Sequence, residues 1–145
     1  RSVEDRFNLA NFMRANLNAS VAVLKIGNDI LFDKEKVKVD RITGHGGLFK
    51  TPGVGQRVLA AALNSPISVM NTAGEGGAWG MALLAAYTVN NRTELPLDSW
   101  LELEVFAGEK GTEIRPTLEE VEGFNRYIKK YIDALPIEQK AIETV

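Results

Sequence analysis

The chain contains no cysteine, and it has a single histidine, His45, among its 145 residues. Without cysteine there can be no disulfide and no thiolate metal site, and one histidine excludes a multi-histidine metal site within the chain. These absences exclude thiolate and multi-histidine metal sites, and we expect no metal-ligating residues in the chain.

Strong charge and long apolar runs are also missing. The formal net charge is −2, so there is no basic excess of the kind that binding to nucleic acid requires. No apolar run approaches the roughly 20 residues of a membrane span, and the charged start RSVEDRF is unlike a signal peptide. We expect a cytoplasmic protein without nucleic-acid or membrane partners. A length of 145 residues with 45% hydrophobic content is enough for one domain with a core.

Two glycine-rich loops lie within residues 42–87. Each follows a short β-branched run and leads into an alanine-rich helical run, and the loops read GHGGLFKT and AGEGGAWG. A glycine turn between a strand and a helix start brings backbone N–H groups close to a ligand, and the helix dipole there favours an anion. On the residues alone, a tight turn without a ligand explains the first loop equally well.

Neither loop carries a complete nucleotide-binding motif. The order G-x-x-x-x-G-K-[ST] is absent, and G-x-G-x-x-G fails because Phe49 stands at its last position. A dinucleotide-binding domain is further disfavoured by the lack of an acidic ribose-binding residue after a following strand.

Several side chains in the loops have chemical potential. Lys50 and Thr51 could offer a cation and a hydroxyl to an anionic ligand, while Glu75 is either a helix-start charge or a contact at a shared site. His45 is better explained as a loop histidine with a structural hydrogen bond than as a catalyst. Gly80, in the following helix, is better explained by close packing against another backbone.

Hydrophobic periodicity predicts alternating helices and strands before residue 91. The predicted helices cover residues 8–32, 54–63 and 78–89, and the predicted strands cover 37–43 and 67–70. This order predicts an α/β fold in which short parallel strands are joined by crossover helices.

The remainder of the chain alternates first and then becomes helical. Residues 100–107 predict an edge strand or hairpin arm, so that 91–116 is a loop or edge-strand insertion. Thr117 and Glu120 form a predicted capping box, and Pro136 is expected to end the helix before a short final one. We expect a single domain over residues 1–145, with residues 117–145 as its C-terminal helices.

GHGGLFKT with its preceding strand, and AGEGGAWGMALLAAY after the next strand, resemble the C-terminal domain of FGGY carbohydrate kinases. The family commonly has a Gly-Gly-Gly-Ala-Lys-Ser-like run and then Glu-Gly-(Gly/Ala)-Ala-x-Gly-Ala-Ala-x-x-Ala. Arg14-Ala15 adds a third agreement, although the family's usual acid is replaced by Asn18. The resemblance covers about residues 9–90 and is nearest to xylulokinase-like pentulose kinases. It implies a ribonuclease-H-like, actin-like ATPase fold, present here in part.

The resemblance also implies ATP and Mg²⁺ as cofactors. The family's glycine pair and Lys-Ser correspond to residues of the first loop, with Phe49 as one extra residue, and its Glu-Gly corresponds to residues of the second loop. The candidate nucleotide-binding residues are therefore Gly46, Gly47, Lys50, Thr51, Glu75 and Gly76.

No acid of this chain matches the aspartate that activates the sugar hydroxyl in such kinases, and family members are much longer. The resemblance thus implies the nucleotide-side part of a sugar kinase, with no catalytic residue here, inactive alone, and with sugar contacts in a preceding part. A non-catalytic nucleotide-binding or sensing module of the same fold is the alternative. Exposed apolar residues on the first helix would make a homodimer plausible.

Overall fold

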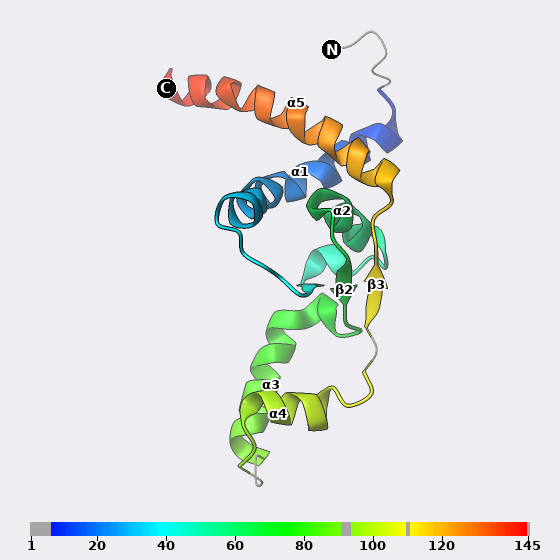
Figure 1. The fold of residues 1–145 in the computed structure, drawn as a ribbon, viewed down its shortest axis with the longest axis vertical. Helices are drawn as coiled ribbons and strands as arrows, with labels where there is room; N and C mark the ends of the chain where they lie inside the picture. Colours follow the sequence, from blue (N-terminus) through cyan, green and yellow to red (C-terminus); the bar gives the residue numbers. More distant parts are fainter. Residues whose placement is uncertain (1–6, 91–93, 110, 145) are drawn as a thin grey trace.

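The computed structural model describes residues 7–90, 94–109 and 111–144. Its body is built around helix α2 (Val54–Leu63), which contacts both α1 (Leu9–Asp29) and α5 (Leu118–Glu143). Figure 1 shows α1 and α5 at one end of the molecule and α3 (Gly76–Asn90) at the other, with a small sheet between them. The chain is thus mixed α/β and mostly helical.

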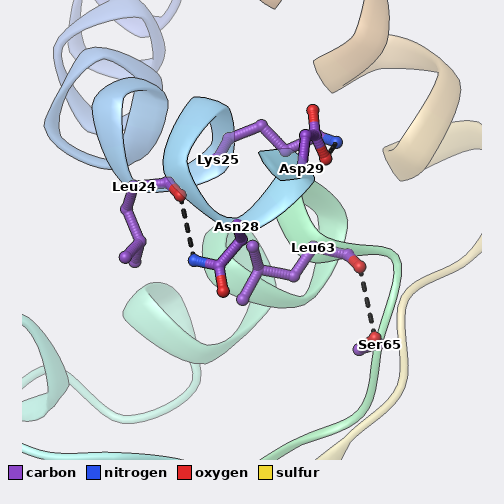
Figure 2. Close-up of polar contacts among 6 residues, drawn as sticks. All are labelled: Leu24, Lys25, Asn28, Asp29, Leu63 and Ser65. Atoms are coloured by element: carbon purple, nitrogen blue, oxygen red, sulfur yellow. Dashed lines mark hydrogen bonds and ion pairs between the residues drawn. The ribbon is translucent and has the colours of Figure 1, made fainter. Parts of the chain in front are cut away.

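Helix α1 confirms the prediction of a long first helix. The Asn8 side chain caps its start by accepting a hydrogen bond from the Asn11 N–H at 2.8 Å, and the chain continues past its end as a π-helical turn, η1 (Ile30–Lys34). Asparagine is a poor interior helix former. Within α1, the Asn28 side-chain amide donates a hydrogen bond to the Leu24 carbonyl of the preceding turn at 2.9 Å (Figure 2).

The sheet has the order β1-β2-β3 and contains one parallel and one antiparallel pair. Strand β1 (Ile42–Gly44) lies parallel to β2 (Ile67–Val69), with α2 in the connection between them, which confirms the predicted parallel pair. Strand β3 (Thr112–Ile114) lies antiparallel to β2 and was not predicted from the sequence. The predicted strand over residues 37–43 is realised only from Ile42 onward.

The prediction of a strand at residues 100–107 is wrong. This segment is helical, with α4 (Leu97–Trp100) continuing into the π-helical η4 (Leu101–Val105). The Trp100 ring attaches it to α3, because its centroid lies 5.4 Å from that of the Tyr87 ring. The Tyr87 hydroxyl also donates to the carbonyl of Leu95, just before α4, at 2.6 Å. The place beside β2 is instead taken by β3.

The prediction that Pro136 ends the last helix is also wrong. Helix α5 continues through it to Glu143, as Figure 1 shows, and the predicted separate final helix is absent from the described residues. Proline removes one backbone hydrogen bond from a helix interior. The surrounding turns are exposed to solvent, so water can satisfy the carbonyl that loses its partner. The predicted capping box of Thr117 and Glu120 is confirmed.

The core lies where α1, α2, α5 and β2 meet. Alanines on α2 allow both neighbouring helices to approach it closely, while larger side chains fill the space between the elements. The buried cluster consists of Val21, Ala22, Leu59, Ala60, Ala61, Ala62, Ile67, Phe124 and Ile128.

Candidate functional site

The two glycine-rich loops meet at one edge of the sheet. They follow β1 and β2, and because these strands are parallel neighbours their carboxyl ends lie side by side. The Gly46 N–H donates to the Ala73 carbonyl at 2.7 Å, which joins one loop to the other. Short 3₁₀ turns follow at η2 (Gly47–Phe49) and η3 (Ala73–Glu75). Parallel pairing of the strands thus turns two separate sequence motifs into one surface.

An ion pair connects the same loops through their side chains. The Lys50 Nζ lies 2.5 Å from the Glu75 Oε1, and the two side chains are 57% and 74% exposed. The Lys50 stem passes over Gly74, where an added Cβ would lie 3.2 Å from its Cγ. An ion pair this exposed contributes only about 0–1 kcal/mol to stability, so Lys50 is easily released to another anion.

A cavity of about 660 Å³ opens between the loops and the sheet. This is within the range of roughly 300–1,000 Å³ typical of small-molecule sites. Its polar lining residues are Lys50, Gln56, Asn71, Glu75 and Thr112.

Gln56 supports one wall of this cavity and was not anticipated from the sequence. Its side chain is buried, and its amide donates to the Ile67 carbonyl at 3.1 Å and to the Thr112 carbonyl at 2.9 Å. These bonds fix α2 to β2 and to β3 at the cavity. The available signal was a single amide that, with Arg57, is one of two polar side chains in a helix otherwise made of glycine and apolar residues.

The six predicted site residues divide into two groups. Lys50 and Glu75 line the cavity, whereas the other four, Gly46, Gly47, Thr51 and Gly76, do not. Gly46 has φ 102°, a conformation that favours glycine, and an added Cβ at Gly46 or Gly47 would meet no atom within 4 Å. The glycine pair therefore presents open backbone beside the cavity.

Residues 1–89 match the sequence model of one protein family, described as the FGGY family of carbohydrate kinases, C-terminal domain. This is more than half of the chain and includes both glycine loops. The chain belongs to the FGGY family of carbohydrate kinases. These enzymes are ATP-dependent phosphotransferases, and their C-terminal domain is of the actin-like ATPase, ribonuclease-H-like kind. No curated protein and no solved structure matches the chain.

Within this FGGY domain, Gly76 has a packing role. An added Cβ there would lie 2.9 Å from the Nδ1 atom of His45, so the imidazole lies directly against the start of α3. No hydrogen bond joins the His45 side chain to another residue in the described ranges, so the contact is one of packing. The absence of a side chain at Gly76 is what permits it.

Close packing does not explain Gly80. An added Cβ there would meet no atom within 4 Å, and most of α3 is exposed. The packing prediction for this glycine is therefore wrong among the residues that the structure describes.

Two classes of site find no support in the described part of the chain. It holds no group of three His, Asp or Glu side chains that could bind a metal ion. It also has no helix that is both long and apolar enough to span a membrane.

Proposed function

We propose that the chain binds ATP in the cavity between the two glycine loops, as the nucleotide-side part of a sugar kinase. The reaction would transfer the ATP γ-phosphate to a sugar hydroxyl, with D-xylulose or another pentulose as the expected sugar. The observation that carries the proposal is the meeting of both loops on one cavity with Lys50 at its wall. The FGGY family membership supports it.

Lys50 would neutralise phosphate charge, and Glu75 would be its partner only until the nucleotide arrives. Glu75 holds the lysine through an exposed ion pair, which phosphate can replace at little cost. The open backbone at Gly46 and Gly47 would let the nucleotide approach closely. These residues would thus bind and orient the nucleotide, and phosphoryl transfer depends largely on such positioning.

Mg²⁺ fits this arrangement as a companion of the nucleotide. It commonly takes phosphate and water oxygens with only one or two carboxylates, and the described residues offer no cluster of three acids. When bound, the ion would neutralise charge developing on the phosphates. The residues discussed here would orient the nucleotide that carries it.

Ligand-dependent melting tests whether the cavity binds ATP. ATP and ADP should raise the Tm of the chain, and NAD should not. Gly46→Val should abolish the shift but also strains a backbone at φ 102°. Gly47→Ala is the cleaner variant because its Cβ would enter open space. It should preserve the Tm without ligand and reduce the shift with ATP; an unchanged shift would mean that the glycines form only a turn.

Lys50→Gln and Glu75→Gln should change nucleotide affinity in opposite directions. The first removes the cation and should weaken ATP binding, whereas the second frees the cation and should strengthen it, each by up to about fivefold. Isothermal titration calorimetry with ATP measures both Kd values. Weakening by both variants would show that Glu75 contacts the nucleotide instead of competing with it.

We further infer that the chain alone does not phosphorylate sugar, because none of its acids matches the family's catalytic aspartate. ATP-dependent phosphorylation of D-xylulose by the purified 145-residue chain would contradict this. The same observation favours, as a second candidate, a non-catalytic nucleotide-binding or sensing module of this fold. Kinase turnover by the natural full-length gene product would exclude that candidate.

A further inference from the structure

A second cavity, of about 640 Å³, lies between α1, α2 and α5. It shares no lining residue with the cavity at the glycine loops. We refer to it as the three-helix cavity. A ligand bound there would therefore occupy a site separate from the proposed nucleotide site.

Arginines from three different helices line the three-helix cavity: Arg14 on α1, Arg57 on α2 and Arg126 on α5. Arg57 is held by Glu120, with the Nη1 and Oε1 atoms 3.2 Å apart. Among the described residues, Arg14 and Arg126 have neither an ion pair nor a side-chain hydrogen bond. Two guanidinium groups are thus available to an incoming anion.

Two carboxylates also line the cavity, and they determine its charge. Glu120 is committed to Arg57 and to the Thr117 N–H, and that backbone hydrogen bond lowers its pKa, so it is ionised at neutral pH. Glu119 is the other carboxylate. Three arginines against two glutamates leave one net positive charge in the cavity, although the whole chain carries −2.

The lining also has a substantial apolar part. Phe124 and Ala61 are buried core residues, and Leu17 and Val58 line the cavity beside them. Gly123 adds no side chain, and a Cβ placed there would find its nearest heavy atom, of Arg126, only at 3.8 Å. The cavity thus combines a cationic part with an apolar part.

We propose that the three-helix cavity binds a small organic anion, a phosphate or carboxylate group on a compact apolar body. Arg14 and Arg126 bind the anionic group, since guanidinium presents paired donors that match the oxygens of phosphate and carboxylate. The apolar body lies against Leu17 and Val58, which are only partly buried, so it removes apolar surface from water. This inference concerns a site beyond the proposed nucleotide site and does not depend on it.

Titration of the ¹⁵N-labelled 145-residue chain with phenyl phosphate tests the proposal by NMR. Backbone amides along the cavity on α1, α2 and α5 should shift in a saturable manner. Inorganic phosphate and phenol should each bind more weakly, because each supplies only one of the two parts. Equal binding of inorganic phosphate and phenyl phosphate would contradict the role of the apolar lining.

Charge-removing variants identify the groups that bind the anion. Arg14→Gln and Arg126→Gln should each weaken phenyl phosphate binding by about tenfold, the effect of losing a charge-assisted contact. Both side chains are exposed, so the Tm should not change. Arg115→Gln is the matched control, since Arg115 lies outside the cavity and pairs with Glu113.

The two proposed sites can be separated with the same variants. Gly47→Ala should leave phenyl phosphate binding unchanged, and Arg14→Gln should leave the melting shift with ATP unchanged. Binding that persists in both arginine variants, or amide shifts confined to the glycine loops, would overturn the proposal for the three-helix cavity. Neither result would argue against ATP binding at the loops.

Discussion

Helices α2 and α3 arise from similar sequence units but have opposite environments. Each follows one of the two parallel strands and a glycine loop, and each is rich in alanine. Helix α2 lies at the centre of the body, with Leu59 and three successive alanines buried. Helix α3 extends away from α1, α2 and α5 (Figure 1). It is largely exposed, including Met81 and Leu84.

The difference comes from the neighbours that each helix has. Helices α1 and α5 and strand β2 contact α2, whereas α3 contacts η3 and reaches α4 through Tyr87 and Trp100. An apolar, alanine-rich sequence therefore permits burial without causing it. Burial requires other elements that cover the helix.

Truncation of one leucine in each helix should give the largest difference in stability between α2 and α3. Leu59→Ala should lower the free energy of unfolding by about 2–5 kcal/mol, because it leaves a cavity in the core. Leu84→Ala, at a side chain that is 48% exposed, should cost less than about 1 kcal/mol. Urea unfolding followed by circular dichroism measures both. Equal losses would show that α3 is covered in solution.

Replacement of one glycine by alanine in each helix should change the free energy of unfolding in opposite directions. In α2, a Cβ at Gly55 would lie 2.5 Å from the Leu48 carbonyl oxygen, so Gly55→Ala should destabilise the fold by about 1–3 kcal/mol. In α3, Gly80→Ala meets open space and should stabilise the helix by about 0.5–1 kcal/mol. The urea concentrations at which the two variants are half unfolded, each compared with that of the parent chain, measure the two effects. Destabilisation by Gly80→Ala would reveal a neighbour on α3.

The smallest effect concerns the first turn of α5, the helix that helps to cover α2. The Thr117 N–H donates to the Glu120 carboxylate and, with the Arg57 side chain, holds the pKa of that carboxyl below its usual value. The ionised form therefore stabilises the fold above the unfolded pKa, and this contribution is lost as the pH falls through the lowered folded value.

Replacement of Glu120 should accordingly flatten the acid limb of the stability profile. Glu120→Gln should lose roughly 1 kcal/mol or less at neutral pH and lose less than the parent chain on acidification to about pH 3. Urea unfolding across that range measures the profile, and Glu122→Gln on the same helix serves as the control. An identical acid limb in parent and Glu120→Gln would remove this role from Glu120.

Local features of the fold followed from the sequence because their causes are local. Helix α2 and the capping box at Thr117 appear at the predicted residues, since a cap or a turn depends on residues only a few positions apart. The prediction of a strand at residues 100–107 was wrong because alternation of apolar and polar residues does not determine which segment pairs with β2.

Two glycine loops after two strands, and the family to which the chain belongs, could both be predicted from the residues alone. Which residues of the two loops share a cavity depends on how the strands and helices pack. Lys50 and Glu75 come together only because β1 and β2 pair in parallel, and three distant arginines meet only because α1, α2 and α5 pack together. Spacing along a chain fixes hydrogen bonds within a turn, but contacts between distant segments depend on the burial that brings them together.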